Sequence, residues 1–162
     1  MADMSQRVTR TIAARPEGMF TLLADPGRHP SLDGAGMVRG LVSGPATLSA
    51  VGDAFVMAMN QDGLGDYQMR SEVVALEPGR RIAWAPAVHP PGALSAFIGD
   101  TDPSGHVYAW DLEPADDGGT RVTHTYDWSG VRDETALPLY PRVSTAQMEA
   151  TLDNLEDAVR PG

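Results

Sequence analysis

The chain has 162 residues, 42% of them hydrophobic, so a domain of ordinary size can bury a core without metal or disulfide staples. It contains no cysteine, which excludes disulfides, thiolate metal sites and thiol nucleophiles. The formal net charge is -10, and the 12 basic residues are arginines without a cluster, so nucleic acid is not an expected partner.

The N-terminus carries no basic segment followed by an apolar run, and no stretch approaches the ~20 apolar residues that cross a bilayer. We therefore expect a cytoplasmic protein without a membrane span. Its length predicts one domain over residues 1–162.

The first elements are a strand and two short helices. Alternating side chains over 6–13 predict the strand. Pro16 and Glu17 suit the first turn of a helix that Asp25-Pro26-Gly27 ends, and residues 30–33 predict one further helical turn.

Strand-like runs follow without an intervening helical pattern, so we expect antiparallel hairpins. They cover 37–42, 52–60, 67–76, 81–85, 106–113 and 120–128, which makes seven strands with the first. Residues 86–105 are rich in proline, glycine and small side chains and are predicted to form a long surface loop.

The last element is a long helix. Ser144 and Gln147 form a predicted capping box, and Met148, Leu152, Leu155 and Val159 recur at intervals of three and four. Pro161 is expected to end the helix. Its apolar stripe must lie against an apolar surface, for which the sheet is the natural candidate.

Three turns predict which side chains share a face of the sheet. A hairpin centred on Asp117 pairs His106 with Trp128, Tyr108 with Tyr126, Trp110 with His124, and Leu112 with Val122. A hairpin centred on Gly63 pairs Met59 with Tyr67, Met57 with Met69, and Phe55 with Ser71, and the Pro78-Gly79 turn pairs Ala75 with Ile82 and Val73 with Trp84.

The other face of the last hairpin is predicted to meet solvent, with Ala109, Asp111, Glu113, Arg121, Thr123, Thr125 and Asp127. The inner face carries hydroxyl, indole and imidazole groups that a solid core would leave without partners. A partly hollow interior lined by aromatic rings and adaptable methionines is typical of a small-molecule site.

In this order of elements the chain resembles the helix-grip, or SRPBCC, superfamily. The resemblance spans residues 7 to about 159 and rests on TIAARPE (11–17), FTLLADP (20–26), RHP (28–30), DG (33–34), EPGRRIAW (77–84), LEP (112–114) and GGTRVT (118–123). Residues 87–105 depart from the pattern, being longer and richer in proline. Members include START lipid-binding domains, birch-pollen-allergen-like proteins and polyketide cyclase/dehydrase-like proteins, the branch this chain looks like.

The resemblance implies an α+β helix-grip fold, in which a curved seven-stranded antiparallel sheet (six or seven strands) wraps the C-terminal helix. It also implies a ligand-holding cavity without fixing a chemistry. The expected ligand contacts are Phe55, Met57, Met59, Tyr67, Met69, Trp84, Tyr108, Trp110, His124, Tyr126, Trp128, Met148 and Leu152.

The first hypothesis is a binding or carrier protein for a hydrophobic or aromatic small molecule, without metal or other cofactor. The second is a cofactor-free polyketide cyclase or dehydratase in which His124 or Tyr126 moves a proton. The third is a protein-interaction module of the co-chaperone type, and a homodimer is a reasonable expectation for any of them.

Smaller features have two interpretations. His124 can be an acid-base group, or it can form a hydrogen bond to a neighbour in a partly hydrated core. Tyr108 and Tyr126 can donate hydrogen bonds to a ligand, or they can serve packing with their hydroxyls bonded to water. Asp33 near His29 suggests an acid-base pair at the cavity mouth, against an ordinary turn or capping role. The four histidines are too widely separated to predict a zinc site.

Overall fold

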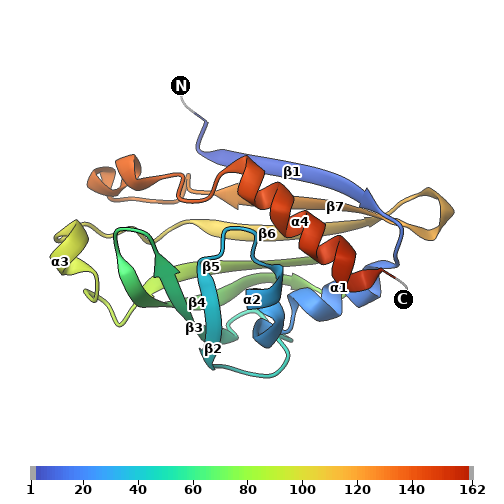
Figure 1. Cartoon of the computed structure of the whole chain (residues 1–162), viewed down its shortest axis with the longest axis horizontal. Coiled ribbons are helices and arrows are strands. Elements are labelled where there is room, and N and C mark those ends of the chain that lie inside the picture. Colours follow the sequence, from blue (N-terminus) through green and yellow to red (C-terminus); the bar gives the residue numbers. More distant parts are fainter. Residues whose placement is uncertain (1–2, 161–162) are drawn as a thin grey trace.

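A computed structural model describes residues 3–160 as one curved antiparallel sheet crossed by a long helix (Figure 1). The sheet order is β1-β7-β6-β5-β4-β3-β2. Its strands are β1 Ser5–Ile12, β2 Val38–Ser43, β3 Ala54–Gln61, β4 Gly65–Glu77, β5 Arg81–His89, β6 Val107–Pro114 and β7 Thr120–Asp127. The helices are α1 Pro16–Leu23, α2 His29–Leu32, α3 Ser95–Ile98 and α4 Thr145–Val159, with short 3-10 turns η1 Pro26–Arg28, η2 Asp116–Gly118 and η3 Glu134–Leu139.

The predicted fold class is confirmed. Seven antiparallel strands, two short helices after the first strand and a long C-terminal helix are all present. Within residues 3–160, no helix combines the length and the hydrophobicity that crossing a bilayer requires.

The start of α4 forms as its sequence predicts. The Ser144 hydroxyl accepts the backbone N–H of Gln147 at 3.1 Å, and the Gln147 side-chain oxygen accepts the N–H of Ser144 at 2.9 Å. Met148, Leu152 and Leu155 are fully buried against the sheet. The prediction that Pro161 ends this helix falls outside the described residues.

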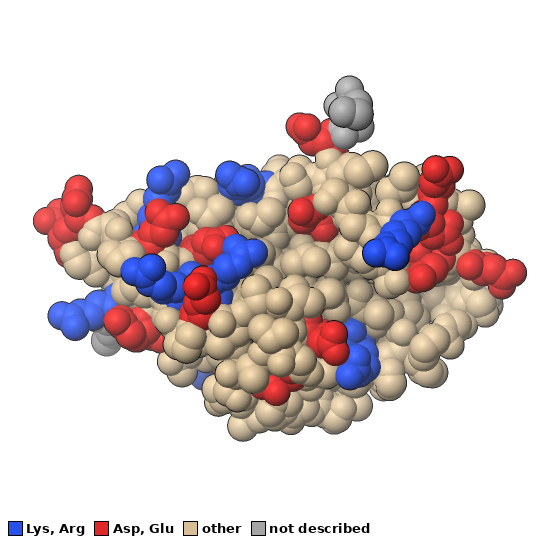
Figure 2. Space-filling model, turned by 180° about the vertical axis from the view of Figure 1, so that it is seen from behind, with Lys and Arg blue, Asp and Glu red and all other residues tan. Residues whose placement is uncertain are grey.

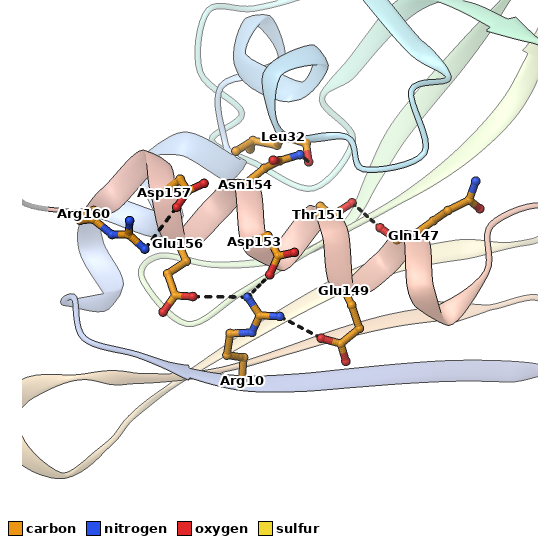
Figure 3. A network of polar contacts seen from close by, with 10 residues as sticks. All are labelled: Arg10, Leu32, Gln147, Glu149, Thr151, Asp153, Asn154, Glu156, Asp157 and Arg160. Carbon is orange, nitrogen blue, oxygen red and sulfur yellow. Dashed lines mark hydrogen bonds and ion pairs between the residues drawn. The ribbon is translucent and has the colours of Figure 1, made fainter.

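The exposed side of α4 is tied to β1 by one arginine (Figure 3). Arg10 contacts the carboxylates of Asp153 at 2.6 Å, Glu149 at 3.0 Å and Glu156 at 3.3 Å. Arg160 and Asp157 form a separate, more exposed pair at 3.3 Å. Three acidic side chains on the exposed side of α4 therefore attach the helix to the sheet.

Two of the three predicted hairpin registers are correct. Tyr108 lies opposite Tyr126, and Met57 lies opposite Met69, as the turns predict. The ladder between β6 and β7 starts with Val107 opposite Asp127, one position short of the predicted pair of His106 and Trp128.

The third register is correct only on one side of a bulge. Val73 lies opposite Trp84, but Ala75 lies opposite Ala83, and Ile82 pairs with Leu76. The turn has three residues, 78–80, where two were predicted, so the pairs next to it are shifted by one position. The extra residue Val74 in β4 then restores the predicted pair of Val73 and Trp84. The predicted pair of Ala75 and Ile82 is therefore wrong.

The outer face of the sheet was predicted to be open to solvent, and Ala109 contradicts this at 6% exposure. Ala109 lies in the central strand β6, between Ala83 of β5 and Thr125 of β7. The side chains of these two neighbouring strands cover its methyl group. Figure 2 shows the side of the molecule away from α4, where acidic and basic side chains are interleaved.

The expected long loop over residues 86–105 is partly regular structure. Strand β5 continues to His89, which pairs with Gln68, and α3 follows at Ser95–Ile98. Strand β6 pairs only with Arg81 to Trp84, so the other edge of β5 has no partner beyond that point. Pro86, which lacks an N–H, is tolerated because the ladder requires no donor there.

Candidate functional site

A cavity of about 400 Å³ lies between the concave face of the sheet and α4. Its walls come from strands β2 to β7 and from α1, α2 and α4, and Leu64, Phe97 and Arg142 surround its outer end. Figure 1 places α3, the turn between β3 and β4, and the segment before α4 at this same end of the molecule.

Most of the side chains predicted to contact a ligand line this cavity. They are Phe55, Met57, Met59, Tyr67, Met69, Trp84, Tyr108, Trp110, His124, Tyr126 and Met148. Alternate residues of paired strands point the same way, and the correct registers bring these side chains together.

Trp128 and Leu152 do not line the cavity. The Trp128 ring packs behind the wall, edge-on to Tyr126 at 5.1 Å and parallel to Tyr140 at 6.3 Å between ring centroids. Leu152 is fully buried in the contact between α4 and the sheet. Both support the wall from outside the cavity.

His124 is a buried titratable group of the wall. Its Nδ1 donates to the carbonyl oxygen of Ala109 at 3.1 Å, because a carbonyl can only accept, so Nε2 holds a lone pair. Burial lowers the pKa of His124 to about 4, and the ring is neutral at pH 7.

The Nε2 atom of His124 is reachable from the cavity. Within residues 3–160, every buried side-chain nitrogen and oxygen has a hydrogen-bond partner, and His124 bonds only through Nδ1. Its Nε2 must therefore retain accessible surface, and the cavity is the space that the side chain borders. The arrangement presents a neutral acceptor to whatever occupies that space.

Tyr108 and Tyr126 stack across the strand pair with ring centroids 4.5 Å apart. Burial raises the pKa of each, well above the ordinary value for Tyr108, so both hydroxyls keep their protons at neutral pH. The Tyr126 oxygen accepts the backbone N–H of Arg142 at 3.2 Å. Tyr126 itself is fully buried in the wall.

A second histidine is fixed by a tyrosine that the sequence did not single out. The Tyr140 hydroxyl donates to the carbonyl oxygen of Pro103 and accepts from His106 Nδ1 at 2.9 Å. Burial lowers the pKa of His106 to about 4 and raises that of Tyr140. This chain of bonds joins the segment before α4 to the segment before β6.

The region of His29 and Asp33 serves packing and turn formation. His29 Nε2 donates to the carbonyl oxygen of Leu23 at 2.8 Å, and its ring stacks on Trp84 with centroids 4.8 Å apart. The Asp33 carboxylate accepts the backbone N–H groups of Ala35, Met37 and Val38. The two side chains thus have separate partners, which favours the turn interpretation of Asp33 over an acid-base pair.

The polar residues of the cavity mouth were missed at the sequence level. Gln61, Tyr140 and Arg142 all line the cavity. Tyr140 and Arg142 lie in an irregular segment without periodicity, so neither strand alternation nor helical spacing could place them. The prolines of this segment, Pro138 and Pro141, mark a turn at most.

No three His, Asp or Glu side chains gather as a metal-binding group anywhere in residues 3–160. The expectation of a site without metal or other cofactor stays a prediction.

A family model described as polyketide cyclase / dehydrase and lipid transport matches residues 4–160. Among curated proteins, the chain is 34% identical over 164 residues to the uncharacterised protein Rv0088 of Mycobacterium tuberculosis, covering 96% of this chain and 65% of that protein. The chain thus spans 65% of the length of the curated relatives it matches.

Solved structures share the fold at low identity. Protein CV1439 from Chromobacterium violaceum has a TM-score of 0.64 and 18% identity, with 98% of this chain and 99% of that chain covered. The Aha1 dimer from Colwellia psychrerythraea has a TM-score of 0.58 and 18% identity, with 98% and 96% covered. The solved structures show the shared fold, and the family match shows that this chain belongs to the polyketide cyclase/dehydrase and lipid transport family of the SRPBCC superfamily.

Proposed function

We propose that this protein binds a hydrophobic or aromatic small molecule in the cavity between the sheet and α4. The main observation behind this proposal is a cavity of about 400 Å³ that is lined by aromatic rings and thioethers, with a few polar side chains among them. That volume lies within the range of small-molecule sites. Binding would be driven by burial of apolar surface, which contributes about 25 cal/mol per Å².

The wall suits a planar or flexible apolar ligand for a physical reason. Met57, Met59 and Met69 form one side with unbranched side chains that adapt to different shapes. Trp84 and Trp110 line the cavity from the other strands, and one ring face of each is covered by a stacked histidine. Both indoles border the cavity, so ligand entry should change their fluorescence.

The test is a titration of planar aromatic and long-chain apolar probes, followed by tryptophan fluorescence. Saturable quenching is expected in the native chain. Ser71→Leu should weaken probe binding at least about tenfold. Ser71 is buried and lines the cavity, so a leucine side chain at this position would fill part of the space.

Glu72→Leu is the matched control, since Glu72 follows Ser71 on β4, is exposed and points to the opposite face. It should bind the probes as the native chain does. A Ser71→Leu protein that folds and binds every probe with native affinity would contradict the proposal, as would a native chain that responds to none of them.

A cofactor-free cyclase or dehydratase is the second candidate, favoured by the neutral Nε2 of His124 at the cavity surface. In this function the cavity holds a folded substrate, His124 accepts a proton and Tyr126 donates one. His124→Gln should then abolish turnover of a polyketide-like substrate while binding changes by only a few fold. Full turnover in His124→Gln would remove His124 as the catalyst.

We also propose a homodimer and a cytoplasmic location. A protein of the same fold, from Colwellia psychrerythraea, was solved as a dimer. Light scattering after size exclusion would measure the mass in solution, and a mass of one chain, 17.2 kDa, would contradict the dimer.

A further inference from the structure

The cavity mouth carries one permanent cation. Arg142 is the only arginine bordering the cavity within the described chain, and its side chain is exposed at the rim. The guanidinium meets the side chain of Gln61, whose amide is satisfied when its oxygen faces Arg142. Arg142 Nε then donates to this oxygen at 2.9 Å, a second donation comes from Nη2, and the Gln61 amide donates to the Tyr67 hydroxyl at 3.2 Å.

The backbone beneath this guanidinium is fixed from two sides. The Arg142 N–H donates to the Tyr126 hydroxyl at 3.2 Å, and the next carbonyl, of Val143, accepts from the Gln6 side chain at 2.8 Å. Both partners lie on strands of the sheet, β7 and β1. The position of Arg142 at the rim is therefore set by the fold.

No protein carboxylate neutralises this charge in residues 3–160. The ion pairs there involve Arg10, Arg81 and Arg160, whereas the guanidinium of Arg142 donates to the neutral amide of Gln61. The one carboxylate bordering the cavity, Asp33, is occupied by three backbone N–H donors at 2.8–2.9 Å. The mouth thus has donor capacity and positive charge beside an apolar interior.

We propose that the cavity selects an apolar molecule that bears a carboxylate, with the apolar body against the aromatic and methionine walls and the carboxylate on Arg142. A guanidinium binds a carboxylate through parallel N–H donors. The Tyr67 hydroxyl, which accepts from the Gln61 amide, borders the same cavity. The inference rests on the proposed function, because it specifies the ligand class of the same cavity.

The test uses one apolar body with three head groups. The probes 2-naphthylacetate, 2-naphthylacetamide and 2-naphthylethylamine differ mainly in charge, and decanoate, decanamide and decylamine repeat the comparison on a chain. Dissociation constants are measured calorimetrically for the native chain, for Arg142→Gln and for Arg132→Gln. Arg132 is an exposed arginine that does not border the cavity, so it controls for the loss of one positive charge.

The native chain should bind each carboxylate about tenfold more tightly than its amide, which corresponds to 1.4 kcal/mol. Arg142→Gln should abolish this preference, Arg132→Gln should retain it, and added salt should reduce it, because the guanidinium is near solvent.

Other outcomes separate this inference from the proposed function. Equal binding of the three head groups, or a preference for the amines, would overturn the carboxylate inference while cavity binding stands. A carboxylate preference that persists in Arg142→Gln would overturn the role of Arg142. Absence of binding by all six probes would overturn both, since the inference needs the cavity to take an apolar body.

Discussion

The imidazole of His124 lies flat against the indole of Trp110, with ring centroids 3.8 Å apart and ring planes inclined by 14°. The stack covers one face of a ring whose Nδ1 is already bonded to the Ala109 carbonyl. Protonating His124 would place a charge where water cannot reach most of the ring, which is why its pKa falls to about 4.

The first prediction is a loss of stability at mildly acidic pH. The pKa values of His106 and His124 are both about 4 in the folded chain, below the ordinary 6.5. At a pH between 4 and 6.5, both histidines are protonated in the unfolded chain and neutral in the folded chain. The stabilising contribution is therefore complete above pH ~6.5 and is lost as pH falls towards ~4, by roughly 1.4 kcal/mol per pH unit for each histidine.

Urea denaturation between pH 4.5 and 7.5 measures this slope. His124→Gln should make the slope shallower by about the share of one histidine, because glutamine does not titrate while it can still donate to the Ala109 carbonyl. An unchanged slope in His124→Gln would show that His124 does not have the lowered pKa.

The second prediction concerns the attachment of α4 to β1. Arg10→Met should destabilise the protein by about 1 kcal/mol, because Arg10 contacts three carboxylates that then repel one another. Arg160→Met is the control, since both partners of the Arg160 and Asp157 pair are 66% exposed. Urea denaturation at low and high salt should show a loss for Arg10→Met that shrinks with salt, and equal losses for the two variants would contradict the expectation.

The third prediction uses two glycines in different surroundings. A Cβ on Gly34 would lie 2.5 Å from the backbone oxygen of Gln147 and 2.6 Å from the Cβ of Ala150, so Gly34→Ala should force α2 away from α4. We expect a loss of about 1–3 kcal/mol or more in unfolding free energy.

Gly18 is the matched control, because a Cβ there meets nothing within 4 Å and the residue lies inside α1. Gly18→Ala should raise stability by about 0.5–1 kcal/mol, the usual gain for alanine in a helix. Thermal unfolding measures both variants, and a Gly34→Ala protein as stable as the native chain would contradict the packing of α2 against α4.

The fourth prediction concerns the bonds of Tyr140. Tyr140→Phe removes the acceptor of His106 and the donor to Pro103, so the buried His106 N–H loses its partner. The expected cost is about 1–3 kcal/mol. Tyr67→Phe, which removes the acceptor of the partly buried Gln61 amide, should cost less in the same urea experiment, because water can replace that bond.

Much of the cavity wall followed from turn positions alone. The turns at Gly63 and Asp117 each fixed a register, and the alternation along the strands then brought Tyr108, Met57 and Met69 to one face. A strand has a period of two residues, so a correct turn determines the direction of every side chain in a regular hairpin.

The parts that could not be predicted depend on local irregularity or on long-range contacts. The bulge between Val73 and Ala75 carries no glycine or proline to mark it. Pro86 suggested a loop, because its tolerance inside β5 depends on where β6 stops pairing. Arg142 reaches the cavity mouth through bonds to Tyr126 and Gln61, which are distant in sequence.

The two edges of the sheet are the first and second strands of the chain. Strand β1 pairs only with β7, and the chain crosses through α1 and α2 before β2 begins the opposite edge. During synthesis, β1 therefore has no strand to pair with until residues 120–127, which form β7, leave the ribosome. A truncation before residue 120 would leave that early segment as an open edge, prone to pairing with another molecule.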